Sequence, residues 1–170
     1  MRYFFILFLT LFISSCGFHP RGSVTLSPSL QQLYIKSADP YGWLPRSLAN
    51  YLSYSGVHTT TSAENADTIL EIQSVTKNEQ LLSVSGTQQT RQYNLILSVT
   101  FQLTDPKGQI LVASQTVSES RILTVASDQI LGGSNEADNL YQQMHQPILY
   151  DIVTRLTSRN VTTALEQKKP

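Results

Sequence analysis

Residues 93–103 read Tyr93-Asn94-Leu95-Ile96-Leu97-Ser98-Val99-Thr100-Phe101-Gln102-Leu103, and their pattern determines the expected architecture. Apolar residues occupy every second position of this stretch, and the positions between them are polar except for Ile96. Because successive side chains of a β-strand point to opposite faces, the alternation predicts a half-buried strand. Asp105-Pro106-Lys107-Gly108 then has the residue types of a type I turn, and the run 110–117 returns. The sequence therefore predicts a central β-hairpin.

Weaker patterns extend this hairpin into a sheet. The runs 33–35 and 68–72 are rich in aliphatic residues and predict two further strands, the second of which continues unevenly to Val84. The returning strand is extended or followed by the run 121–125. On the best strand, the face opposite the apolar one carries neutral polar residues: Asn94, Ser98, Thr100 and Gln102. We expect that face to be solvated or to lie against a polar partner.

Two amphipathic segments predict helices. The first covers 44–52, and the second runs from Ser134 or Asn135 to Leu156, where apolar residues recur every four positions. Pro147 is expected to kink or divide the second helix because it lacks an N–H donor. Together the elements predict an α+β fold: a two-layer sandwich in which two helices pack on one face of a mostly antiparallel, mixed sheet of about four strands.

The N-terminus predicts export and membrane attachment. Met1-Arg2 is followed by the mostly apolar run 3–13, which is typical of a secretory signal peptide and shorter than the roughly 20 residues that span a bilayer. Ile13-Ser14-Ser15-Cys16 resembles the lipobox of bacterial lipoproteins. That resemblance implies cleavage before Cys16, a diacylglycerol on its sulfur and a further acyl chain such as palmitate on the freed amine. Several acyl chains together anchor a protein stably.

The chain is therefore divided into four expected parts. Residues 1–15 form a signal peptide that is removed, and residues 16–30, which are interrupted by glycine and proline, form a lipidated tether. Residues 31–159 form the α+β domain. Residues 160–170 lack an apolar stripe and are expected to form a flexible tail.

Composition excludes several classes of function. The formal net charge is zero, so no basic face is available for nucleic acid. A single cysteine excludes a disulfide framework and a cysteine-based zinc site. Only 14% of the residues are charged, whereas serine, threonine and glutamine make up 52 of the 170 positions. The chain is polar mainly through neutral groups.

Catalytic and metal-binding patterns are weak. The three histidines have no metal-ligand spacing, and no nucleophile-elbow, P-loop or dinucleotide motif occurs. Ser74-Val75-Thr76-Lys77 matches the SxxK pattern of penicillin-binding proteins, but it falls in an expected strand, where the two side chains cannot share one helical turn. The sequence predicts no enzyme, no catalytic residue, no metal and no cofactor. A secreted hydrolase would need a pocket with a perturbed histidine or carboxylate.

The residues after the cysteine carry a specific resemblance. Cys16-Gly17-Phe18-His19-Pro20-Arg21-Gly22 resembles the start of the LptE (RlpB) family of lipopolysaccharide-assembly lipoproteins from Gram-negative outer membranes. The segments 91–95 and 105–108, together with the helix that carries Leu140-Tyr141 and Met144, are similar to the family's central strands and last helix. Pro20 and Pro147 depart from the family pattern. The family-motif residues carried over are Gly17, Phe18, His19, Arg21 and Gly22.

The resemblance implies a non-enzymatic role. Members of the family plug the LptD β-barrel in a one-to-one complex, assist its assembly, bind lipopolysaccharide and complete the translocon that inserts it into the outer leaflet. The implied location is the outer membrane, with a lipid anchor and with the domain in the barrel lumen facing the periplasm. Because lipopolysaccharide carries phosphates, Arg91, Lys107 and Arg121 are candidate binding residues, each also explicable as a solvated surface cation. The alternative is an envelope lipoprotein that binds peptidoglycan or scaffolds another periplasmic complex.

Overall fold

A computed structural model describes residues 27–86, 90–126 and 130–167. The elements in chain order are η1 (Pro28–Leu30), β1 (Gln32–Ser37), α2 (Trp43–Tyr54), β2 (His58–Thr60), η2 (Ala63–Asn65), β3 (Thr68–Val84), β4 (Thr90–Thr104), β5 (Ile110–Ala126), α3 (Ile130–Leu156) and α4 (Arg159–Gln167). The strands form one mixed sheet in the order β2-β1-β3-β4-β5. β1 runs parallel to both β2 and β3, whereas β4 runs antiparallel to both β3 and β5.

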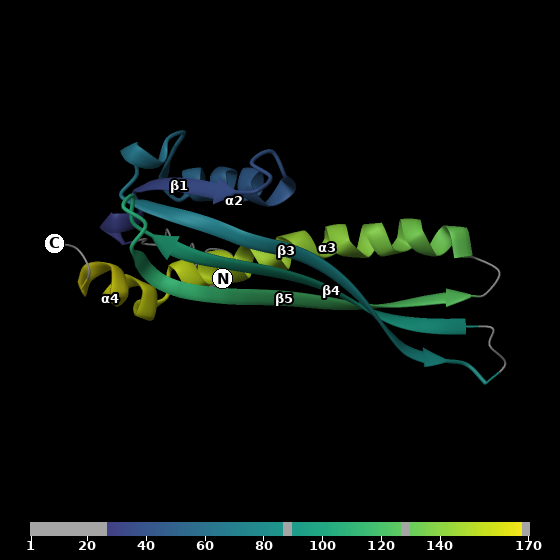
Figure 1. The fold of residues 1–170 in the computed structure, drawn as a ribbon. Helices are drawn as coiled ribbons and strands as arrows, with labels where there is room; N and C mark the ends of the chain where they lie inside the picture. Colours follow the sequence, from purple (N-terminus) through teal and green to yellow (C-terminus); the bar gives the residue numbers. More distant parts are fainter. Residues whose placement is uncertain (1–26, 87–89, 127–129, 168–170) are drawn as a thin grey trace, which may run out of the picture.

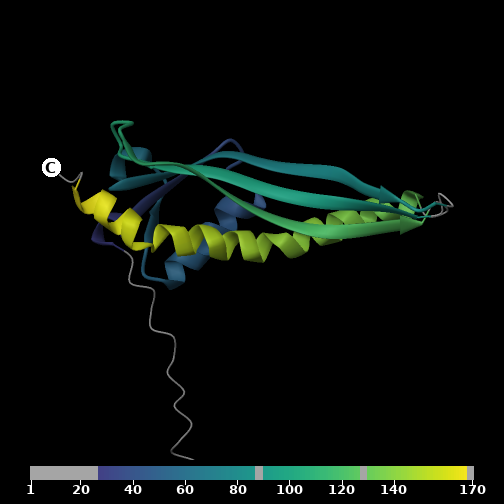
Figure 2. The same cartoon turned by 90° about the horizontal axis from the view of Figure 1, so that it is seen from below.

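The helices cover one face of the sheet and leave the other face open, as Figure 2 shows. The predicted alternation of β4 is confirmed, because Leu95, Leu97, Val99, Phe101 and Leu103 are all buried. They pack with the apolar faces of α2, α3 and α4 in one continuous core. The predicted two-layer α+β class is therefore confirmed.

The central hairpin has the expected turn. The Gly108 N–H donates to the Asp105 carbonyl at 3.0 Å, which closes the turn between β4 and β5. Gly108 has φ +85°, a left-handed conformation in which a side chain would be strained. The predicted short helix is α2, and the predicted strands at 33–35 and 68–84 are β1 and β3.

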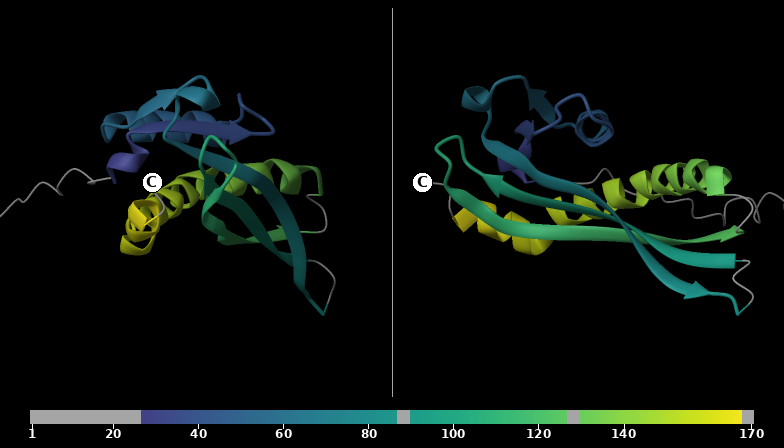
Figure 3. Two further views of the ribbon diagram at one scale, coloured as in Figure 1. Left: turned by 60° about the vertical axis from the view of Figure 1, so that its left-hand side comes forward. Right: turned by 45° about the vertical axis from the view of Figure 1, so that its right-hand side comes forward.

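The sheet has two parts of different width. β1 pairs with β3 only as far as Ser37 and Ile72, and Gln73 forms a β-bulge directly after this point. Beyond the bulge, β4 is the only described strand that pairs with β3. We call the five-stranded part the proximal half. The three-stranded part, comprising residues 74–84, 91–100 and 116–125, we call the distal extension; it runs alongside α3 (Figures 1 and 3).

The structure corrects three expected boundaries, the first of them at α3, which begins at Ile130 and not at Ser134 or Asn135. The later start was expected because Gly132 and Gly133 precede Ser134, and glycine costs about 1 kcal/mol per residue in a helix. Tertiary packing can override such local preferences. Of the two expectations for Pro147, a kink or a division, the division is wrong, because the helix continues through Pro147. Met144 and Ile148 are fully buried on either side of Pro147, so the core holds the helix together where one backbone hydrogen bond is missing.

The other two corrections concern the ends of the domain. Residues 160–170 were expected to form a flexible tail, but α4 reaches Gln167 and buries Val161 and Leu165, which lie one turn apart. Residues 27–30 were expected to belong to the tether, but Leu30 is 1% exposed and packs in the core. The sheet has five strands because β2, a three-residue strand without an apolar pattern, was not predicted.

Candidate functional site

The open face of the distal extension, together with the residues that adjoin it on each strand, consists mainly of neutral polar side chains. Since Leu95, Leu97 and Val99 point into the core, the intervening residues of β4 and their cross-strand partners point away from the helices. This neutral face is made of Gln73, Ser74, Thr76, Asn78 and Gln80 of β3, Gln92, Asn94, Ile96, Ser98, Thr100 and Gln102 of β4, and Ser114, Thr116, Ser118, Ser120, Ile122 and Thr124 of β5. Only the two isoleucines are apolar, and none of these side chains is ionisable.

Hydrogen bonds connect the rows of the neutral face. The Ser98 and Ser118 hydroxyls lie 2.8 Å apart, and the Thr100 and Thr116 hydroxyls lie 3.0 Å apart. The Ser114 hydroxyl donates to the Gln73 amide oxygen at 2.8 Å. Each hydroxyl has one donor and two acceptor sites, so these pairs leave unused capacity toward solvent. The face is suited to a partner that offers hydrogen bonds, and it is unsuited to lipid tails or to a polyanion.

At its proximal end, the open face of the sheet contains a hollow of about 520 Å³. Its lining includes Tyr34, Lys36, Ala63, Ile69, Glu71, Gln102, Thr104, Asp105, Pro106 and Gly108. Lys36 Nζ lies 2.7 Å from Glu71 Oε1, and the Gln102 amide donates to Glu71 Oε2 at 2.6 Å. The hydrogen bonds from Lys36 and Gln102 lower the pKa of Glu71, and the hydrogen bond to Glu71 raises the pKa of Lys36. We call this site the Lys36–Glu71 hollow.

The three candidate cations do not form one site. Arg91 lies at the far end of β4, whereas Lys107 lies in the turn beyond its other end. Arg91 and Thr104 are thirteen positions apart on β4, which corresponds to about 43 Å at about 3.3 Å per residue. Arg121 is on the helix-covered side of β5, opposite Leu95. Its guanidinium lies 3.1 Å from Glu119 Oε2, so a carboxylate already neutralises it.

Arg91 has a different environment from the other two. It is exposed, and it forms no ion pair with any residue that the structure describes. Its cross-strand neighbours are Val84 and Val125, and the nearby Leu81 and Leu82 are each about half exposed. A free cation therefore lies among exposed aliphatic side chains at the tip of the distal extension.

A polar cluster between α3 and β3 was not predicted from the sequence. Lys77 lies 3.4 Å from Asp138 and 4.7 Å from the centre of the Tyr141 ring, and the Tyr141 hydroxyl donates to the Asn78 carbonyl at 3.0 Å. Nearby, the His145 ring stacks on Trp43 with 3.7 Å between centroids, and burial lowers the pKa of His145, with a smaller contribution from Lys77. The sequence feature that could have indicated this cluster is the spacing of Tyr141 and His145, which lie one helical turn apart on the same side of α3. These contacts join the helices to the distal extension.

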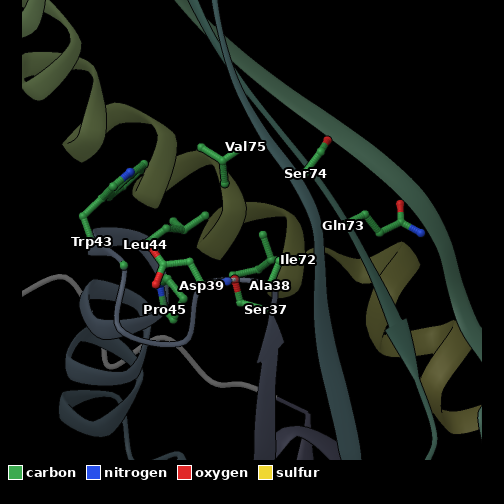
Figure 4. A pocket seen from close by; sticks show the side chains of 11 residues that line it. Ser37, Ala38, Asp39, Trp43, Leu44, Pro45, Ile72, Gln73, Ser74 and Val75 are labelled. Carbon is green, nitrogen blue, oxygen red and sulfur yellow. Dashed lines mark hydrogen bonds between the residues drawn. The ribbon is translucent and has the colours of Figure 1, made fainter.

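A second hollow, of about 300 Å³, lies between the start of α2 and β3 (Figure 4). Trp43, Leu44 and Pro45 line it from the α2 side, and Ile72 and Val75 line it from β3. Its lining is mainly apolar, with Asp39 as the charged side chain. Nothing in its described lining pairs a nucleophile with a base.

The remaining predictions concern the lipidation and family-motif residues, the SxxK segment and metal binding. Cys16 and the motif residues Gly17, Phe18, His19, Arg21 and Gly22 lie outside the described residues. The SxxK segment is a strand, as predicted, and Ser74 and Lys77 point to opposite faces of it. Within residues 27–86, 90–126 and 130–167, no group of three histidine, cysteine or acidic side chains is arranged to hold a metal ion.

None of the described helices combines the length and the apolar character that crossing a bilayer as a helix requires.

Solved structures with this fold include two lipoproteins. The solution structure of an uncharacterized lipoprotein B from Nitrosomonas europaea is similar with a TM-score of 0.69 and 24% identity, covering 89% of this chain and 97% of that one. The crystal structure of the rare lipoprotein B from Shewanella oneidensis has a TM-score of 0.61 and 24% identity, covering 78% of this chain and 98% of that one. These likenesses support the fold.

Sequence comparison identifies the family. The LPS-assembly lipoprotein LptE of Pectobacterium atrosepticum is 28% identical over 155 residues, covering 88% of this chain and 81% of that protein. The protein of the same name from Yersinia enterocolitica is 28% identical over 151 residues, covering 86% and 70%. The family model described as "LptE: Lipopolysaccharide-assembly" matches residues 30–156, which is most of the chain from η1 to the end of α3. The chain therefore belongs to the LptE family of lipopolysaccharide-assembly lipoproteins.

Proposed function

We propose that this protein is a lipid-anchored lipoprotein of the outer membrane that plugs an LptD-like β-barrel, assists its assembly and binds lipopolysaccharide. Cys16 carries the acyl chains, and the domain lies in the barrel lumen and faces the periplasm. The role is non-enzymatic: the protein positions the barrel and the lipid for transfer to the outer leaflet. The observation that carries the proposal is the neutral face, in a chain that belongs to this family.

The chemistry of the neutral face fits a barrel interior. The lumen of a large outer-membrane barrel is polar. Rows of hydroxyls and amides, such as the Ser98–Ser118 and Thr100–Thr116 pairs, can exchange hydrogen bonds with such a wall without burying an unpaired charge. An apolar face would favour lipid, and a basic face would favour any polyanion, so neutrality supports a partner of mixed polar character.

The length of the sheet also supports the proposal. The fifteen residues of β4 span about 50 Å at about 3.3 Å per residue. This exceeds the roughly 30 Å of the hydrocarbon core of a bilayer. A plug of this length, held at one membrane leaflet by its anchor, reaches the level of the other leaflet.

Arg91 is the best of the three candidates for contact with lipopolysaccharide. A guanidinium recognises phosphate through paired hydrogen bonds, and exposed aliphatic groups beside it suit acyl chains. Arg91 offers both, because Val84 and Leu81 lie on its side of the sheet and are exposed. Arg121 is already paired with Glu119, and Lys107 lies at the opposite end, so both contribute less.

Co-purification tests the plug. The full lipidated chain is extracted in detergent through an affinity tag, and the expected result is a stable one-to-one complex with a much larger barrel protein. Ser98→Asp places a charge in the middle of the neutral face and should abolish the complex. The matched control Ser53→Asp, on the exposed side of α2, should retain it. A wild-type chain that is monomeric and sediments with peptidoglycan would support the alternative function and contradict this one.

Lipopolysaccharide capture tests Arg91. Replacing Arg91 and Arg121 together by Asp should weaken capture on immobilised lipopolysaccharide without unfolding the domain. The single variant Arg91→Asp should account for most of that loss, at about tenfold or more, and Lys107→Asp for little of it. Unchanged capture by the double variant would rule out both arginines as binding residues.

A further inference from the structure

The Lys36–Glu71 hollow is the place where charged groups gather on an open face that is otherwise neutral. None of the side chains that make up the neutral face is ionisable, whereas Lys36, Glu71 and Asp105 all line the hollow. Its volume of about 520 Å³ lies within the range of about 300–1,000 Å³ that is usual for small-molecule sites. The hollow is continuous with the neutral face through Gln102, which belongs to both.

The polar groups of the hollow are already held in place. Glu71 accepts from Lys36 at 2.7 Å and from Gln102 at 2.6 Å, and the Ser114 hydroxyl donates to the Gln102 amide oxygen at 3.3 Å. The Lys36 ammonium has three donors and its side chain is 60% exposed, so donors remain for a ligand. The Thr104 hydroxyl makes no hydrogen bond with any described residue, although Thr104 is only 7% exposed. The site therefore offers fixed donors and acceptors in an arrangement that binding does not need to build.

The remaining lining is apolar and includes one aromatic ring. Tyr34 is half-buried on the strand next to Glu71, and Ile69 and Pro106 also line the hollow. An aromatic face carries partial negative charge and attracts the partly positive hydrogens of C–H groups. A ligand with an apolar C–H face and a rim of hydroxyls satisfies both halves of this lining. A pyranose sugar has this construction.

The charges of the hollow select against an anion. The charged side chains that line the hollow are one ammonium, of Lys36, and two carboxylates, of Glu71 and Asp105. The Lys36 ammonium is also occupied by Glu71 at 2.7 Å, so a phosphate would meet a carboxylate at the cation it needs. An uncharged polyol suffers no such repulsion.

We propose that the Lys36–Glu71 hollow binds uncharged sugar units of the lipopolysaccharide oligosaccharide. Tyr34 packs on the sugar ring, and Lys36, Glu71, Gln102 and Thr104 exchange hydrogen bonds with its hydroxyls. This proposal rests on the proposed function for the source of the sugar. It places glycan recognition at the proximal end of the sheet, on the opposite end from Arg91.

The test uses the full lipidated chain in detergent. Its ligands are the two products of mild acid hydrolysis of lipopolysaccharide, which are the lipid-free oligosaccharide and lipid A. Calorimetric titration with the lipid-free oligosaccharide should show saturable binding. Tyr34→Ala, which removes the ring, should weaken binding of the oligosaccharide by about tenfold or more. Tyr34→Phe, which keeps the ring, should bind nearly as well as the wild type. Thr104→Val keeps the shape but removes the hydroxyl and should weaken binding severalfold. The matched control Thr154→Val, on the exposed side of α3 and away from both the hollow and the neutral face, should bind like the wild type.

The outcomes separate this proposal from the proposed function. Capture of intact lipopolysaccharide and of lipid A, with no binding of the oligosaccharide, overturns the sugar site and leaves the proposed function standing. Failure to bind intact lipopolysaccharide contradicts the proposed function itself. Binding of the peptidoglycan-like trisaccharide chitotriose, but not of the lipopolysaccharide oligosaccharide, overturns the assigned source. Equal binding by Tyr34→Ala and the wild type overturns the site, provided that circular dichroism shows both to be folded.

Discussion

The two parts of β3 share one strand but have different surroundings. In the proximal half, Leu70 and Ile72 lie between β1 and β4 under the helices, and both are buried. In the distal extension, Val75 and Leu81 also point to the side of the helices, yet they are 43% and 52% exposed. The difference arises because β1 ends at Ser37, so that β3 changes from a central strand to an edge strand. On β3, the part in the proximal half therefore contributes buried side chains to the core, whereas the part in the distal extension presents surface.

Core truncation should give the largest contrast between the two parts. Leu70→Ala removes a fully buried side chain and should cost about 2–5 kcal/mol of unfolding free energy. Leu81→Ala makes the same chemical change on the same strand, but the side chain is half exposed, so the cost should stay below about 1 kcal/mol. Urea unfolding followed by the fluorescence of Trp43, the single tryptophan, measures both. Equal losses would show that the distal part of β3 is as much a part of the core as the proximal part.

The contacts of α3 with the extension should have a smaller, local effect. Tyr141→Phe removes the hydrogen bond to the Asn78 carbonyl and should cost about 1 kcal/mol. Since that bond lies in the distal extension, amide hydrogen exchange should accelerate between residues 74 and 84 and remain unchanged between 68 and 72. Uniform acceleration along β3 would mean that the two parts unfold as one unit.

The Trp43–His145 stack should make stability depend on pH. Burial lowers the pKa of His145 in the folded state below its usual value of 6.5, so the unfolded state binds the proton more tightly. This contribution to stability is complete above about pH 6.5 and is lost as the pH falls through the pKa of the folded state. The urea midpoint should therefore decrease between pH 7 and pH 5, and His145→Gln should reduce that decrease. An identical pH dependence in the variant would contradict the assignment.

The hydroxyl pairs of the neutral face should have the smallest effect on stability. Ser98→Ala combined with Ser118→Ala removes an exposed hydrogen bond and should change the unfolding free energy by no more than about 0.5 kcal/mol. The same double variant should lower the yield of the barrel complex, because the face is proposed to contact the barrel wall. Loss of stability above about 1.5 kcal/mol would show that the face is structural.

Local patterns predicted the elements whose environment is uniform. The alternation from Tyr93 to Leu103 was sufficient for β4 because the helices cover one side of it along almost its whole length. The second part of β3 gave an uneven pattern for a physical reason. Neither of its sides is well buried, so the sequence has no need to alternate. β2 has three residues and no apolar pattern, and pairing with β1 alone defines it.

The ends of the helical layer could not be predicted from local preferences. Gly132-Gly133 and the residues capable of capping after them indicate a start near Ser134, whereas α3 begins at Ile130. Val161 and Leu165 have helical spacing, but two residues are a weak pattern without knowledge of the core that receives them. For the candidate site, the sequence indicated the polar face through Ser98 and Thr100. The gathering of Tyr34, Glu71 and Gln102 needed the strand register, because they lie on three different strands.

The β-bulge at Gln73 determines where β3 can lose or gain a residue without exchanging its two faces. Deleting Val75 would move Lys77 and Leu81 onto the open face and turn the Thr76 hydroxyl inward, because a shift of one position exchanges the faces of a strand. Deleting Gln73 itself would instead leave a regular ladder in which Ser74 still pairs with Thr100. Leu82, at the second irregularity, has the same property. Single-residue insertions and deletions among relatives should therefore concentrate at these two positions of β3, whereas substitutions can occur along the whole extension.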